Sequence, residues 1–135
     1  MSREPGSPLL RSAKSLVDEA MEHIETIPVA VARELVGDET VLFVDIRDPR
    51  EWERHGMIPG AYPAPRGMLE FWVDPESPYY KPALDDGRTL LLYCGSAWRS
   101  ALAAETLQEM GLPVAHLEGG FGAWKASGGP IVQKG

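Results

Sequence analysis

Residues 89–110 constrain the fold of this chain more than any other segment, because a short apolar run passes directly into an amphipathic pattern. The apolar run at 90–93 has the length of one strand that is buried on both faces. After Arg99, apolar residues recur at helical spacing with polar residues between them. The pattern predicts a buried strand that ends at Cys94, a tight loop, and a helix that begins near Arg99.

The predicted position of Cys94, the only cysteine of the chain, favours a reactive thiolate. In open parallel sheets, ligands bind at the carboxyl ends of the strands. The first N–H groups of a helix carry partial positive charge, and converging loop amides can bind an anion. With Arg99 close by, these groups favour the thiolate, which is the nucleophilic form of cysteine. A free cysteine at a strand end is often only a small buried apolar residue, but the loop, the helix and Arg99 favour a functional role.

Length and composition narrow the classes of protein. A chain of 135 residues suits one domain with one sizeable core. The formal net charge of −7 argues against nucleic acid or an anionic membrane surface as a partner. A single cysteine excludes an internal disulfide and a cysteine-rich metal site. No apolar run has membrane-spanning length, and the first residues lack an apolar signal core, so we expect a cytoplasmic protein.

Strand and helix patterns alternate along the chain, which predicts an α/β domain with a mostly parallel sheet. Further strands are expected at 26–29, 41–46 and 61–64, and further helices at 9–25, 31–36, 48–56 and 121–126. The helix at 48–56 has Asp48 as its N-cap and ends at Gly56. The amphipathic helix at 9–25 precedes the alternating part, so the chain divides into a tail and helix at 1–25 and a domain at 26–135. We expect this helix to pack on its own domain, with a homodimer through it as the alternative.

Three motifs resemble those of the rhodanese-like sulfurtransferase family. The active-site loop of that family typically runs from the cysteine through four residues to an arginine, then Ser or Thr; here it is Cys94-Gly95-Ser96-Ala97-Trp98-Arg99-Ser100. Residues 45–61 are similar to the N-terminal signature of the family, and residues 117–131 to its closing motif. Together the motifs cover roughly residues 26–132. Ala97 is a departure, because many members have glycine there, which permits backbone conformations that alanine resists.

The resemblance implies a five-stranded, mostly parallel sheet flanked by helices, here with an extra N-terminal helix. It also implies that Cys94 takes the outer sulfur of a donor such as thiosulfate or another persulfide, and passes it to cyanide or a thiol. Cys94 and Arg99 would be catalytic, and no metal or cofactor is implied. The residues expected to bind substrate are those of the loop together with one arginine from the covering segment at 63–82: Gly95, Ser96, Ala97, Trp98, Ser100 and Arg66.

Two other functions remain open at this point. A phosphatase or arsenate reductase also uses a cysteine and an arginine around an anion, although the related dual-specificity phosphatases have a loop one residue longer. A non-catalytic binding module is the third reading, although inactive modules often lack the cysteine. We expect Asp45 and Arg47 to form a structural ion pair, with Glu51 as a further partner, and His55 to lie at a solvated helix end.

Overall fold

Strand β4 (Thr89–Tyr93) is the central strand of one five-stranded sheet in the computed structural model, which describes residues 3–133. The strand order is β1-β5-β4-β2-β3, and every neighbouring pair is parallel. The other strands are β1 (Glu25–Ile27), β2 (Val41–Asp45), β3 (Tyr62–Pro63) and β5 (Val114–Leu117). The predicted α/β class with a five-stranded parallel sheet is confirmed.

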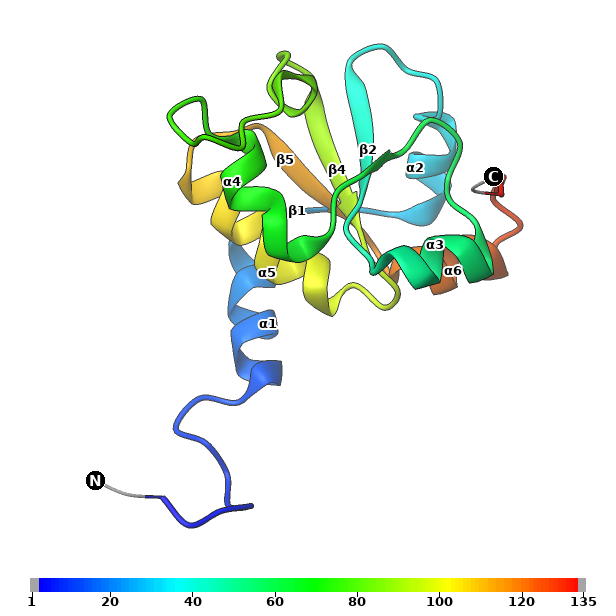
Figure 1. The fold of residues 1–135 in the computed structure, drawn as a ribbon. Helices are drawn as coiled ribbons and strands as arrows, with labels where there is room; N and C mark the ends of the chain where they lie inside the picture. The colour runs from blue at the N-terminus through cyan, green and yellow to red at the C-terminus, as the bar shows by residue number, and fades with distance from the viewer. Residues whose placement is uncertain (1–2, 134–135) are drawn as a thin grey trace.

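The apolar run of β4 is buried on both faces of the sheet because successive side chains of a strand point in opposite directions. Leu90 and Leu92 belong to one core, and Leu91 and Tyr93 to the other. A sheet with two apolar faces needs a helical layer on each side. The sequence of β4 alone therefore requires the three-layer arrangement that Figure 1 shows.

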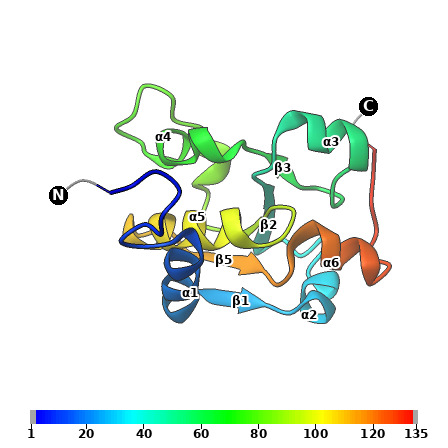
Figure 2. The ribbon, with the colours of Figure 1, turned by 90° about the horizontal axis from the view of Figure 1, so that it is seen from below.

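Helices cover both faces of the sheet (Figures 1 and 2). One face carries α1 (Ala13–His23), α4 (Leu69–Val73) and α5 (Trp98–Glu109), and the other carries α2 (Val29–Glu34) and α6 (Gly120–Ala126). The short α3 (Pro49–His55) follows β2, and single 3-10 turns lie at Arg66–Met68 and Pro82–Leu84. As predicted, Asp48 caps α3 and Gly56 ends it. None of the helices within residues 3–133 is long and apolar enough to cross a membrane.

Helix α1 begins four residues later than its apolar pattern suggested, so the prediction of a start at residue 9 was wrong. The Ser12 side chain accepts a hydrogen bond from the Ser15 backbone N–H and so fixes the first turn. Leu9, which the pattern placed on the apolar face, is exposed ahead of the helix. Val17 and Ala20 are buried in the same core as α5, so α1 packs on its own chain. The homodimer and the division at residue 25 stay predictions.

The N-terminus of α6 holds the end of β4 in place. The Phe121 N–H donates to the Cys94 carbonyl (2.7 Å), and the Gly122 N–H donates to the Gly95 carbonyl (3.0 Å). This close approach explains Gly120, the second of the two adjacent glycines in the closing motif. Gly120 has φ +66°, and a Cβ there would lie 2.6 Å from the Cys94 carbonyl oxygen. Only glycine fits this contact, and the chain turns tightly here between β5 and α6.

We predict that Gly120→Ala destabilises the protein more than Gly128→Ala does. Gly128 also has a positive φ (+82°), but a Cβ there meets nothing within 4 Å. Gly128→Ala should therefore cost only backbone strain, about 1–2 kcal/mol. Gly120→Ala adds a collision with the backbone of Cys94 and Gly95, worth a further loss of about 1–3 kcal/mol. Urea unfolding of both variants measures the difference, and equal losses would show that the contact with α6 is not tight.

Candidate active site

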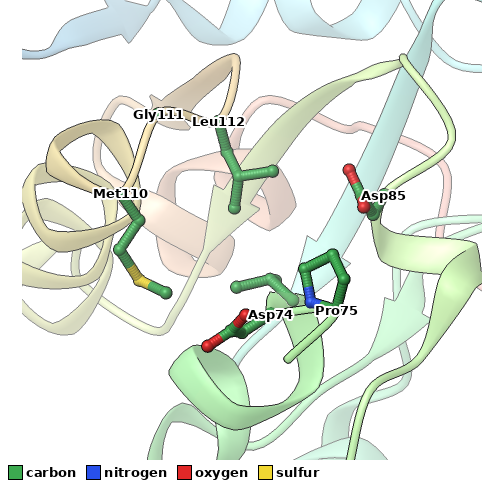
Figure 3. A pocket seen from close by; sticks show the side chains of 7 residues that line it. Asp74, Pro75, Asp85, Met110, Gly111 and Leu112 are labelled. Atoms are coloured by element: carbon green, nitrogen blue, oxygen red, sulfur yellow. The ribbon is translucent and has the colours of Figure 1, made fainter. Parts of the chain in front are cut away.

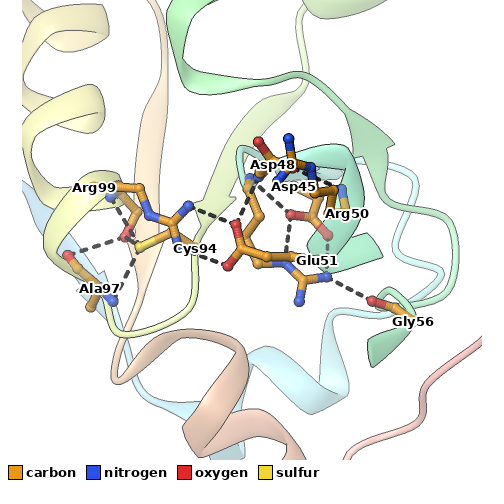
Figure 4. A network of polar contacts seen from close by, with 10 residues as sticks. Asp45, Asp48, Arg50, Glu51, Gly56, Cys94, Ala97 and Arg99 are labelled. Carbon is orange, nitrogen blue, oxygen red and sulfur yellow. Dashed lines mark hydrogen bonds and ion pairs between the residues drawn. The ribbon is translucent and has the colours of Figure 1, made fainter. Parts of the chain in front are cut away.

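The Cys94 loop (residues 94–100) folds around the sulfur of Cys94. The backbone N–H groups of Ala97 and Ser100 lie 3.2 and 3.4 Å from Sγ, and the Ser100 hydroxyl lies 3.7 Å from it (Figure 4). Cys94 itself is 0% exposed. Converging backbone amides at a helix start form an anion site, which suits a thiolate or a charged sulfur attached to it. The loop therefore has the amide arrangement that the sequence predicted.

Ala97 makes this arrangement possible by taking an unfavourable backbone conformation. Its φ is 80°, and it is the only non-glycine residue with a positive φ among residues 3–133. The left-handed conformation costs an alanine roughly 1–2 kcal/mol. It turns the chain from the loop into α5, so that the amides of residues 97 and 100 both face the sulfur. Alanine here takes a conformation that glycine would adopt at lower cost.

Arg99 lies beside the Cys94 loop, but its charge is already paired, which the sequence did not predict. Its guanidinium donates two hydrogen bonds to the Glu51 carboxylate, at 2.9 and 3.0 Å. The bond to Arg99 is the main cause that lowers the pKa of Glu51 to about 2, and the same bond raises the pKa of Arg99. A Cβ on Gly95 would lie 3.2 Å from Arg99 Nη2, so the ion pair lies over the loop. Arg99 thus lies near Cys94, as the sequence predicted, but shares its charge with Glu51, and its role in binding a donor stays a prediction.

Asp45 and Arg47 form the structural ion pair that the sequence predicted, but Glu51 is not its hydrogen-bond partner. Arg47 donates to Asp45 through Nε (2.9 Å) and Nη2 (2.6 Å), and Nη2 also donates to the Gly56 carbonyl. Its guanidinium lies 4.1 Å from the centre of the Phe121 ring. Burial opposes the charge of Arg47, but the bonds to Asp45 outweigh it and raise the pKa of Arg47. The pair fastens the end of β2 to the end of α3.

The remaining predicted substrate residues surround the mouth of the site. Ser96 and Trp98 are exposed on the outer side of the Cys94 loop. Arg66 lines a groove of about 240 Å³ together with Arg47 and Arg99. Its own charge is paired with Glu70 at 2.6 Å, so it is a less available cation than the sequence suggested. The groove lies beside the Arg99–Glu51 ion pair.

A second groove, of about 310 Å³, lies on the other side of that ion pair. It is lined by residues of α3, the Cys94 loop and α6: Arg47, Glu51, His55, Gly95, Phe121, Gly122 and Lys125. His55, at the end of α3, is exposed, as predicted. The Arg99–Glu51 ion pair therefore borders both grooves near the loop.

His116 on β5 is a component of the site that sequence reasoning missed. It is fully buried, and its Nδ1 lies 3.0 Å from the Ser100 hydroxyl. Its Nε2 lies 3.0 Å from the Thr26 hydroxyl on β1. Burial lowers the pKa of His116 to about 4, so the ring is neutral at neutral pH. The signal in the sequence was a single polar residue inside an otherwise apolar strand.

A further cavity, of about 430 Å³, is remote from the Cys94 loop. Figure 3 shows its lining at the C-terminal end of α5, where Met110 and Leu112 face Asp74, Pro75 and Asp85. The loop lies at the other end of this helix, whose twelve residues span about 18 Å. Within residues 3–133, no three His, Cys, Asp or Glu side chains are grouped so that they could hold a metal ion.

Comparisons with known proteins agree with this geometry. The family model of the rhodanese-like domain matches residues 28–127. A protein of Allochromatium vinosum named sulfurtransferase is 35% identical over 104 residues, which cover 76% of this chain and 89% of that protein. An uncharacterized protein of Synechocystis is 35% identical over 109 residues, or 80% of this chain. The chain spans only 56% of the length of that second relative.

A solved structure adds a close match of the whole fold. It is a protein of unknown function from Rhodopseudomonas palustris, described as a possible tyrosine phosphatase. It is 52% identical to this chain with a TM-score of 0.91, and the match covers 96% of this chain and 100% of the other. The family model, the sulfurtransferase relative and the parallel sheet with its cysteine loop lead to one conclusion: the chain belongs to the rhodanese-like domain family.

Proposed function

We propose that the protein is a sulfurtransferase that carries a sulfane sulfur on Cys94. The observation that supports this most directly is the position of Sγ against the backbone N–H groups of Ala97 and Ser100. Fixed donors of this kind stabilise negative charge on a thiolate or a persulfide without reorganising during the reaction. The relative named sulfurtransferase supports the same proposal.

The proposed reaction has two steps in which Cys94 alternates between thiolate and persulfide. In the first, the Cys94 thiolate attacks the outer sulfur of a donor, thiosulfate or another persulfide. The new S–S bond forms as the donor's S–S bond breaks, and the electron pair leaves on the donor, as sulfite when the donor is thiosulfate. In the second, cyanide or a thiolate attacks the outer sulfur, and the electron pair of the broken bond returns to Cys94 Sγ.

A phosphatase is the second candidate, because the relative from Rhodopseudomonas palustris is described as a possible tyrosine phosphatase. Phosphoryl transfer needs a cation for the phosphate oxygens and an acid for the leaving group. Arg99 is paired with Glu51, and a phosphate would have to displace this carboxylate just as an anionic sulfur donor would, so the arginine does not separate the two candidates. The neighbouring carboxylates are also engaged, Asp45 by Arg47 and Asp48 by the Arg50 backbone N–H (Figure 4). These contacts favour sulfur transfer over phosphate hydrolysis.

The proposed small-molecule partners agree with the charge and the chemistry of the chain. The donor is a small sulfur compound and the acceptor a small thiophile, because Cys94 is fully buried and the two grooves beside its loop have volumes of only about 240 and 310 Å³. The net charge of −7 disfavours nucleic acid. We also propose a reducing compartment such as the cytoplasm, since Cys94 must remain a free thiol between cycles.

The function is tested by assaying thiosulfate:cyanide sulfur transfer and para-nitrophenyl phosphate hydrolysis in parallel. The unmodified protein should transfer sulfur with ping-pong kinetics and should not hydrolyse the phosphate ester. Cys94→Ser should stay folded and lose transfer, because a hydroxyl cannot carry a sulfane sulfur. Phosphate ester turnover that depends on Cys94 would overturn the assignment in favour of a phosphatase.

A second prediction concerns Glu51, which competes with an anionic donor for Arg99. Glu51→Gln removes the charge but keeps the side-chain oxygen that accepts the Asp48 N–H in the capping box of α3. We expect kcat/KM for thiosulfate to rise about fivefold, since a partly exposed ion pair is worth up to about 1 kcal/mol. Arg99→Ala should abolish the gain.

The control for this variant is Glu53→Gln, which removes an exposed charge from the same helix without touching Arg99. It should leave kcat/KM within experimental error of the unmodified protein. An unchanged or lower kcat/KM in Glu51→Gln would mean that Arg99 acts in its paired state.

A further inference from the structure

Three polar side chains from distant parts of the chain form a buried line that ends at the sulfur of Cys94. Thr26 on β1 lies opposite His116 on β5 in the parallel register, and their side chains are 3.0 Å apart. His116 in turn lies 3.0 Å from the Ser100 hydroxyl on α5, which lies 3.7 Å from Cys94 Sγ. The line thus crosses from an edge strand of the sheet to the Cys94 loop.

His116 is costly to keep at this position, which implies a role. It lies in a strand whose four residues are all buried. Burying a polar ring costs free energy unless both nitrogens find partners, and here Thr26 and Ser100 supply them. Burial, the one cause that acts on it, lowers the pKa of His116 to about 4. A neutral ring has one nitrogen that donates and one that accepts, so the line of hydrogen bonds has a direction.

The direction decides where the single hydrogen of the Ser100 hydroxyl goes. When His116 carries its proton on Nδ1, it donates to Ser100 Oγ, and the Thr26 hydroxyl donates to Nε2. The Ser100 hydrogen is then free for Cys94 Sγ. With the proton on Nε2, the Ser100 hydrogen is drawn to Nδ1 and the sulfur loses a donor. The carbonyl of Ala97, 3.3 Å from Ser100 Oγ, competes for the same hydrogen, but a thiolate is the stronger acceptor because it is charged.

We propose that His116 is a positioning residue that, with its proton on Nδ1, directs the Ser100 hydroxyl to donate to Cys94 Sγ. The inference rests on the proposed role of Cys94 as the nucleophile. A Cys94 thiol donates to the Ser100 hydroxyl, but the thiolate has no hydrogen to donate and so has three donors: the backbone N–H groups of Ala97 and Ser100 and the Ser100 hydroxyl. The third donor stabilises the negative charge of the free thiolate, and again the charge that returns to Sγ when the acceptor removes the outer sulfur.

The ionisation of Cys94 can be followed directly, because the chain has a single cysteine. The ultraviolet absorbance of the thiolate is measured as a function of pH in the full chain without any sulfur donor. The same measurement on Cys94→Ser gives the baseline. His116→Gln and His116→Asn are the matched pair of variants. The longer glutamine places its amide near Nε2, where it reaches Thr26, whereas asparagine places its amide near Nδ1, where it reaches Ser100.

We expect His116→Gln to move the titration midpoint of Cys94 upward by about one pH unit. A shift of this size corresponds to the loss of one hydrogen bond to a charged group. His116→Asn should keep the midpoint close to that of the unmodified protein, because asparagine still reaches Ser100. Both variants lose one of the two contacts of the ring, so this loss alone cannot explain the difference. Ser100→Ala should give the shift of His116→Gln, and the double variant Ser100→Ala with His116→Gln should add nothing further, since both changes remove the same donor.

Equal shifts in the Gln and Asn variants, no shift in either, or additive shifts in the double variant would each overturn the proposal. Thermal unfolding of each variant confirms that the titration is made on folded protein, and Ser100→Ala stays informative if a His116 variant does not fold. Because no sulfur donor is used, the result is independent of the proposed function. Predicted shifts in a protein that transfers no sulfur would contradict the sulfurtransferase assignment alone.

Discussion

The hydrogen bond from the Phe121 N–H to the Cys94 carbonyl is the contact on which the rest of the site depends. It fixes the peptide group that follows β4 against α6, and the side chain of Cys94 is then left to face α5. The bond is possible because Gly120 lets the two backbones approach, and it is made in a sheet that is buried on both faces. The central strand, α5 and α6 together place the sulfur, although they come from three separate segments of the chain.

Backbone and hydroxyl dipoles, more than side-chain charge, make this site suitable for an anion. The chain is acidic overall, and the arginines around the Cys94 loop are paired: Arg47 with Asp45, Arg66 with Glu70, and Arg99 with Glu51. The N–H groups of Ala97 and Ser100 face the sulfur without such competition. A site of this kind can hold the small negative charge of a sulfur atom, while the arginine at its mouth stays available to a donor that displaces Glu51.

Local patterns in the sequence predicted most of the fold and the centre of the site. The apolar run before Cys94 and the helical spacing after Arg99 indicated the strand, the loop and the helix, all of which the structure contains. The motif that begins at Asp45 indicated its ion pair with Arg47, because the two residues are close in sequence. The first turn of α1 was misplaced, since apolar spacing continues ahead of the Ser12 cap.

Side-chain partners far apart in the sequence could not be predicted in the same way. Glu51 and Arg99 are separated by 48 residues, and nothing local shows that Glu51 turns away from Arg47. The line from Thr26 through His116 to Ser100 joins three elements, and it depends on the register of β1 against β5. Only the three-dimensional arrangement reveals that a histidine in an apolar strand reaches the Cys94 loop.

The central claim is that Cys94 carries the sulfur, and mass spectrometry of the intact protein after incubation with thiosulfate tests it most directly. The account predicts a mass gain of one sulfur atom, located on the peptide that contains Cys94 and removed by cyanide with release of thiocyanate. No gain in mass, or a gain that persists in Cys94→Ser, would contradict it.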